Sequence, residues 1–240
     1  MRIDPEERLA TRERKIIALL NVWPWKMGGT LIGGYAITAY GDPRYSKDAD
    51  IVIPTLLQSA FEGFLRGQGF ELEKSDGDLP LDFEGIAPRY RKDEATIDLL
   101  VGNVRDRRAG IDIPEAWISQ RVRSIRLKTR TGGTEVPLNV ARPEALWVLK
   151  LQAGRDQDLI DLYAILDETI EMNEIVSLFR SLGSETLLQK LSQASGNVAS
   201  EKLFEDAMSR LRKKRTEENR NKWNLFVERV RHIVEESVKV

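Results

Sequence analysis

The sequence predicts an α/β (α+β) fold, with a mixed β-sheet flanked by helices over residues 1–141 and a helical domain over residues 142–240. Two observations lead to this prediction. In the first part, short apolar runs of strand length alternate with helical segments. After Arg142-Pro143, helical periodicity continues almost without interruption, with breaks expected at Gly183 and near Ser195-Gly196-Asn197, and no strand pattern remains. At 240 residues, the chain can hold one large domain or two small ones.

Local sequence signals predict each element of the first domain in turn. A helix begins at Asp4-Pro5, because a capping carboxylate precedes a proline in the first turn. Gly33-Gly34 gives a tight turn between a strand and a short helix. In chain order we expect a helix over 5–20, a strand over 30–32, a helix over 35–40, a strand over 50–53 and a helix over 56–68. A loop over 74–85 then precedes strands over 88–92 and 95–101, a helical turn over 114–119, and a hairpin of residues 121–129 and 134–140.

Composition excludes several classes of site. The chain has no cysteine, which rules out disulfides and thiolate metal sites, and it has one histidine, His232. Any metal site must therefore rest on carboxylates, whose hard oxygen atoms favour Mg²⁺ or Mn²⁺. No run approaches the ~20 apolar residues of a membrane helix, and the charged N-terminus has no signal-peptide core. We therefore expect a cytoplasmic protein with no membrane partner.

The segment over residues 33–53, GGYAITAYGDPRYSKDADIVI, gives the strongest functional signal. Asp48 and Asp50 stand two apart at the start of a strand, so both side chains are expected on one face, with Ala49 on the other. Two carboxylates beside a glycine turn that can admit phosphates suggest metal-dependent phosphoryl or nucleotidyl transfer.

Asp98 adds a third carboxylate on a separate apolar strand. Burial of an unpaired carboxylate is costly, and a metal ion is one way to make it tolerable. Three carboxylates from two adjacent strands could bind two divalent ions roughly 3.5–4 Å apart.

These motifs together resemble those of the polymerase-β-type nucleotidyltransferase superfamily. The shared pattern is an apolar residue, Gly-Gly, a spacer of 13 residues, Asp-x-Asp and a later aspartate on a strand. Within it, the sequence is most similar to the AbiEii-like toxin nucleotidyltransferases. Their Arg-x-Ser/Thr matches Arg44-Tyr45-Ser46, their helix lysine matches Lys150, and their Asp-x-x-Asp-Leu matches Asp158-Leu-Ile-Asp161-Leu. The resemblance implies a nucleotidyltransferase-fold sheet, with the helical domain completing the cleft.

Each matched residue has an expected role. Gly33 and Gly34 let backbone N–H groups approach a triphosphate, and Ser46 donates to a phosphate oxygen. The metal ligands are the three acids, and Asp98 could also take the proton of an attacking hydroxyl. Phosphate charge in the transition state is countered by two cations, Arg44 and Lys150.

In the family, the helix face of Asp158 and Asp161 lies near the cleft, where one of them orients Lys150 or touches the nucleotide. Family members often carry a basic residue just before this pair, where the present sequence has Gln157.

Two basic clusters are candidates for contact with an RNA acceptor, since either could follow a phosphate backbone. The better candidate contains no acid and comprises Arg121, Arg123, Arg126, Lys128 and Arg130. The second is the run over residues 210–215, which is diluted by Glu217 and Glu218. The alternative for both clusters is a solvated surface without a partner.

The expected function is Mg²⁺-dependent transfer of a nucleoside monophosphate from an NTP to an acceptor hydroxyl. The resemblance implies a toxin of a toxin–antitoxin pair, with tRNA 3′ ends as the acceptor and a cognate antitoxin as a partner. Two alternatives keep the chemistry, with either a small molecule of the aminoglycoside type or a protein as the acceptor. The third alternative is a non-catalytic nucleotide-binding regulatory module.

Overall fold

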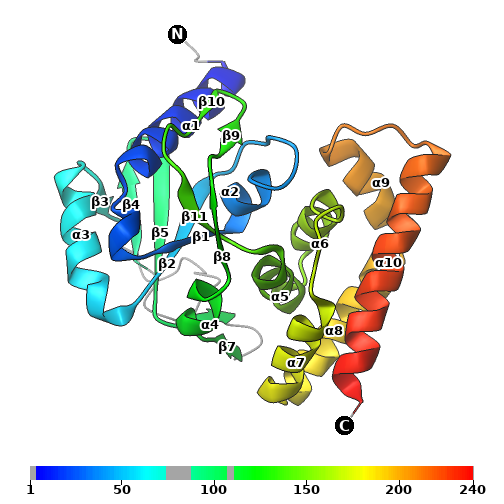
Figure 1. Ribbon diagram of the computed structural model, residues 1–240. Coiled ribbons are helices and arrows are strands. Elements are labelled where there is room, and N and C mark those ends of the chain that lie inside the picture. Colours follow the sequence, from blue (N-terminus) through cyan, green and yellow to red (C-terminus); the bar gives the residue numbers. More distant parts are fainter. Residues whose placement is uncertain (1–3, 74–87, 107–110, 240) are drawn as a thin grey trace. The chain divides into compact units, whose positions relative to one another are not determined.

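A computed structural model describes residues 4–73, 88–106 and 111–239 of the chain (Figure 1). These residues divide into two compact units: unit 1 precedes Pro143, and unit 2 begins there and also includes Ile111. The predicted mixed α/β class is confirmed, because the described residues form a seven-stranded mixed sheet and many helices. Within the described ranges, no helix is both long enough and apolar enough to cross a membrane. The predicted loop over 74–85 lies outside the described residues.

The sheet of unit 1 has the strand order β3-β4-β5-β2-β1-β11-β8. The pairs β2–β5 and β1–β11 are parallel, and all other neighbours in this order are antiparallel. The strands are β1 (Thr30–Ile32), β2 (Asp48–Ile53), β3 (Glu71–Leu72), β4 (Arg89–Lys92), β5 (Ala95–Val101), β8 (Val122–Ile125) and β11 (Leu138–Ala141). Two small ribbons pair β6 (Val104–Asp106) with β7 (Ile111–Ile113), and β9 (Lys128–Thr129) with β10 (Gly132–Gly133).

Helices cover both faces of this sheet, with α3 on one side and α2 on the other (Figure 1). The predicted start of the first helix is confirmed, because the Asp4 side chain accepts the Glu6 N–H. Beside the sheet, the buried ring of Trp23 stacks on Phe61 with centroids 5.0 Å apart. The helices are α1 (Pro5–Val22), α2 (Gly33–Thr38), α3 (Gln58–Gly67) and α4 (Glu115–Ser119), with 3₁₀ turns η1 (Trp25–Met27) and η2 (Thr55–Leu57).

The predicted hairpin over 121–140 is confirmed, but it is interrupted. Its outer parts pair as β8 and β11, and its tip pairs as β9 and β10. Between them, the Leu127 N–H donates to the Thr134 hydroxyl instead of to a strand carbonyl. This side-chain contact ends the regular ladder, which the strand pattern of the sequence did not indicate.

Unit 2 consists of helices around an aromatic core. The ring of Trp223 lies 5.0 Å from Tyr163 and 5.2 Å from Phe226, and Phe226 lies 5.9 Å from Trp147. Burial of these large rings stabilises the unit through apolar contact. The helices are α5 (Pro143–Ala153), α6 (Asp156–Ala164), α7 (Met172–Leu182), α8 (Glu185–Val198), α9 (Glu201–Arg210) and α10 (Glu217–Val238).

Both helix breaks expected in unit 2 are present. Gly183 ends α7 in a left-handed conformation, with φ +52°. The break expected near Ser195-Gly196-Asn197 lies just after that segment, because α8 continues to Val198 and α9 begins at Glu201. The buried residues Leu187, Leu191, Ala194 and Val198 keep helical spacing across the segment. Packing of this face outweighs the weak helix propensity of glycine and asparagine.

Candidate functional site

Asp48, Asp50 and Asp98 lie on one face of the sheet in unit 1. In the parallel pair of β2 and β5, Asp50 stands directly beside Asp98, and Asp48 precedes Asp50 by two residues. Ala49 is fully buried, whereas Asp48 and Asp50 are half-buried. The expectation that the acids come from two adjacent strands, with Ala49 facing away, is therefore confirmed.

Arg89, which the sequence motifs do not include, binds Asp98. Its Nε and Nη2 donate to the two carboxylate oxygens at 2.7 and 2.6 Å, and Nη2 lies 3.6 Å from Asp48 Oδ2. The hydrogen bond with Asp98 raises the pKa of Arg89 above its ordinary value, although burial opposes this. A fixed positive charge therefore stands beside two of the three carboxylates.

The register of the hairpin places Arg89 there. The turn Asp93-Glu94 joins β4 to β5, so that Lys92 lies opposite Ala95 and Arg89 lies opposite Asp98. The sequence predicts these two strands and their short acidic turn. Counting residues back from the turn on both strands would have placed Arg89 opposite Asp98.

Asp48 and the neighbouring Tyr35 lie in a poorly solvated part of the site. Burial raises the pKa of Asp48 above its ordinary value and the charge of Asp98 raises it further, while Arg89 and Arg12 oppose the rise. The Tyr35 hydroxyl is fully buried and has no hydrogen-bond partner among the described residues. Burial raises its pKa as well. Buried polar groups without partners are uncommon, and they often mark functional sites.

Gly33 and Gly34 allow the start of α2 to lie against the acidic strand. Gly33 has φ +66°, and a Cβ atom on it would fall 1.9 Å from Asp50 Oδ2. A Cβ atom on Gly34 would fall 2.3 Å from Ser46 Oγ and 3.3 Å from Arg44 Nη2. Four of the residues expected to bind phosphate, Gly33, Gly34, Arg44 and Ser46, therefore come together with Asp50 in unit 1.

The three carboxylates are chemically suited to a hard divalent cation such as Mg²⁺ or Mn²⁺. The absence of a Cβ atom at Gly33 leaves space for the Asp50 carboxylate on the same face. In the described part of the chain, no group of three or more acidic or histidine side chains stands close enough together to hold a metal ion. Arg89 lies between the carboxylates of Asp48 and Asp98, so a metal ion bound there must displace it.

The remaining expected site residues form a buried ionic cluster in unit 2. The Lys150 Nζ atom, in the last turn of α5, lies 2.7 Å from Asp158 Oδ1 and 2.9 Å from Asp161 Oδ2. The side chain of Lys150 is 13% exposed, and those of Asp158 and Asp161 are 2% and 1% exposed. Burial disfavours the charge of Lys150, but Asp161 and Asp158 outweigh it and raise its pKa. The lysine is therefore charged and held by both carboxylates.

Neighbouring side chains complete this cluster. Arg155 Nε donates to Asp158 Oδ2 at 2.6 Å, and Gln157 Nε2 donates to Asp161 Oδ1 at 2.9 Å. The amide oxygen of Gln157 in turn accepts from Arg210 Nη1 at 2.7 Å. Arg210 of α9 thus brings a positive charge to Gln157.

Comparison with protein-family models gives no match for this sequence, and comparison with curated proteins gives none either. The family resemblance thus rests on the motif residues of the sequence alone.

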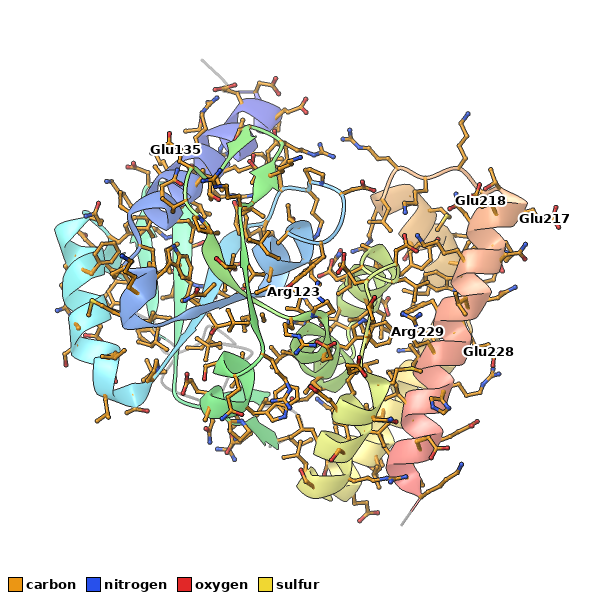
Figure 2. All side chains as sticks on the ribbon, in the orientation of Figure 1. Arg123, Glu135, Glu217, Glu218, Glu228 and Arg229 are labelled. Atoms are coloured by element: carbon orange, nitrogen blue, oxygen red, sulfur yellow. The ribbon has the colours of Figure 1, made fainter. Side chains whose placement is uncertain are left out.

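The expected RNA-binding residues of the hairpin also have roles within unit 1. Arg121 lies 4.2 Å from the Trp117 ring, and Arg123, on β8 (Figure 2), lies 5.7 Å from the Tyr40 ring. Arg130 Nε donates to the Pro43 carbonyl at 3.1 Å. These arginines contact nearby segments, whereas three members of the cluster are exposed on the surface: Arg126, Lys128 and Arg130.

The second basic run lies in unit 2 between α9 and α10. Lys213 lies 5.5 Å from the Tyr163 ring, and Arg215 pairs with Glu205 at 2.9 Å. Figure 2 shows Glu217 and Glu218 at the N-terminal end of α10, directly after this run. The run is therefore partly neutralised by neighbouring acids.

Proposed function

We propose that the protein is a metal-dependent nucleotidyltransferase with the nucleotidyltransferase fold. The reaction joins an acceptor oxygen to the α-phosphorus of an NTP and breaks the bond from that phosphorus to pyrophosphate. The observation that carries the proposal is the alignment of Asp50 with Asp98 on one sheet face, with Asp48 beside them and Gly33 against Asp50.

Each candidate site residue of unit 1 has a role in the proposed reaction. The three acids would hold Mg²⁺, which would neutralise phosphate charge and supply Lewis-acid chemistry. Asp98 also accepts the proton of the attacking hydroxyl. Backbone N–H groups at Gly33 and Gly34, with the Ser46 hydroxyl, bind phosphate oxygens. Positive charge that stabilises the transition state comes from Arg44.

Lys150 is proposed as a second phosphate-binding cation. It is charged, its side chain is 13% exposed, and Asp158 and Asp161 orient its ammonium group. A phosphate would compete with these carboxylates for the ammonium group, so this role is weaker than that of the unit 1 residues.

For the acceptor, we propose the 3′ end of tRNA, within a toxin–antitoxin pair that includes a cognate antitoxin. The resemblance supports this assignment, and the exposed side chains of Arg126 and Lys128 offer phosphate contacts. An RNA acceptor predicts tRNA binding that weakens steeply between low and physiological salt. A small-molecule acceptor predicts no such binding.

The proposal is tested by incubating the protein with each of four α-labelled NTPs, Mg²⁺ and total RNA. Wild-type protein should transfer label to RNA, and Asp50→Asn should reduce transfer to below about 1% because a metal ligand is lost. Asp42→Asn is the matched control, since Asp42 is exposed and belongs to the same loop-to-strand segment. Equal transfer by Asp50→Asn and wild type would reject the site.

A non-catalytic nucleotide-binding module is the second candidate. It is favoured by one observation, the ion pair through which Arg89 neutralises Asp98 without a metal. This candidate predicts NTP binding without label transfer to RNA, protein or aminoglycosides. Label on any of these acceptors would reject it.

A further inference from the structure

Arg12 lies on a face of α1 whose other basic residues are paired. Arg8, Arg12 and Lys15 are spaced four and three residues apart, which places them on one side of the helix. Arg8 binds Glu94 at 2.9 Å, and Lys15 binds Asp93. Because both acids form the turn between β4 and β5, this side of α1 lies against that turn.

The same turn brings Arg12 to the acidic end of the sheet. The turn leads directly into β5, whose second residue, Thr96, stands beside Asp48 of β2. Arg12 is half-buried, and its buried Nε has no hydrogen-bond partner in the described part of the chain. Burial raises the pKa of Asp48 and of Tyr35, and the charge of Arg12 opposes both increases.

We infer that Arg12 contacts the phosphates of the nucleotide, as a substrate-binding residue outside the sequence motifs. This inference rests on the proposed function. A guanidinium group forms its strongest hydrogen bonds with phosphate or carboxylate. The two carboxylates of the adjacent turn are occupied by Arg8 and Lys15, and Asp48 is assigned to the metal. A triphosphate lying along the acidic face supplies the remaining anionic partner.

The test is calorimetric binding of each of four NTPs, their nucleosides and inorganic tripolyphosphate, all with Mg²⁺. The variants are Arg12→Gln and Arg12→Lys, with Arg14→Gln as the control. Arg14 is on the same helix, and its exposed side chain contacts Glu7 and Thr11. Arg12→Gln should weaken binding of the preferred NTP and of tripolyphosphate by about 10- to 100-fold, as expected for loss of a charged hydrogen bond.

The same experiment separates phosphate contact from a structural role. Nucleoside affinity and melting temperature should stay at wild-type values in Arg12→Gln, Arg12→Lys should recover part of the NTP affinity, and Arg14→Gln should bind as wild type. Unchanged NTP affinity in Arg12→Gln would overturn this inference and leave the proposed function standing. Equal loss of nucleoside and NTP affinity, with a lower melting temperature, would also overturn it. A wild-type protein that binds no NTP would overturn the inference and the proposed function together.

Discussion

Arg89 forms a bidentate ion pair with Asp98 across the antiparallel strands β4 and β5. The same guanidinium group lies 3.6 Å from Asp48. A cation from the chain itself therefore stands beside the carboxylates that we assign to a metal ion. Metal binding and this ion pair compete for the same oxygen atoms.

Replacement of Arg89 should therefore strengthen metal binding. In Arg89→Gln, Asp48 and Asp98 lose their neutralising cation, and a metal ion no longer has to displace a charged hydrogen-bonding group. We expect Mn²⁺ affinity to rise by about tenfold, the equivalent of one such bond. Mn²⁺ binding is measured by electron paramagnetic resonance without nucleotide.

Arg91→Gln is the control for this variant, because the exposed Arg91 lies on the same strand and pairs with Glu73. Its Mn²⁺ affinity should equal that of wild type. Unchanged or weaker Mn²⁺ binding by Arg89→Gln would contradict the competition between Arg89 and a metal.

Gly33→Ala should distort the site. The new Cβ atom would fall 1.9 Å from the Asp50 carboxylate, and alanine is strained at φ +66°. We expect a loss of about 1–3 kcal/mol in the free energy of unfolding, together with loss of Mn²⁺ binding.

Gly63→Ala is the matched glycine substitution, because a Cβ atom in this position of α3 meets nothing within 4 Å. It should stabilise the protein by about 0.5–1 kcal/mol through better helix propensity. Chemical denaturation measures both variants. If Gly33→Ala proved as stable as Gly63→Ala, the site would not need a glycine beside Asp50, and this prediction would be wrong.

Lys150→Ala should destabilise the protein whether or not Lys150 binds phosphate. The substitution leaves Asp158 and Asp161 almost fully buried without their shared cation. Breaking such a buried pair costs roughly 3–5 kcal/mol in the free energy of unfolding. Lys202→Ala, at an exposed position of α9, should change it by less than about 0.5 kcal/mol. Equal stability of the two variants in urea would contradict the ionic cluster.

Asp158 should make the stability depend on acid pH. Burial disfavours its charge, but Lys150 and Arg155 outweigh burial and hold the pKa of Asp158 below its ordinary value. A carboxyl group with a lowered folded-state pKa stabilises the fold above its unfolded pKa, and this stabilisation is lost as pH falls toward the folded value. The free energy of unfolding should therefore decrease below about pH 4. In urea titrations between pH 5 and 3, the free energy of unfolding of Asp158→Asn should change less with pH than that of wild type. An equal change in both proteins would contradict this role of Asp158.

The sequence predicted the elements whose signals are local. The apolar runs over 30–32 and 95–101 are strands with those same bounds, since few other structures suit a short continuous apolar segment between turns. The strand expected from Asp50 begins two residues earlier, at Asp48. The break predicted near Gly196 lies slightly later, after Val198, because helix packing depends on distant residues that propensity does not include.

The site could be predicted only as far as its motifs extend. Asp98 was recognisable as a carboxylate in an apolar strand, and Arg89 could have been found from the hairpin register. Arg12 could not, because α1 is held in place by tertiary contacts of Arg8 and Lys15 with a turn far along the chain. Likewise, the sequence placed Asp158 and Asp161 on one helix face, but only the packing of α5 against α6 directs them to Lys150.

The most direct test of the central claim is anomalous diffraction from crystals grown with Mn²⁺ and a non-hydrolysable NTP analogue. We predict a Mn²⁺ peak bounded by the carboxylates of Asp48, Asp50 and Asp98, with Arg89 displaced from Asp98 and the phosphates against Gly33. A peak located elsewhere, with Arg89 still bound to Asp98, would contradict the assignment of this sheet face as a metal and nucleotide site.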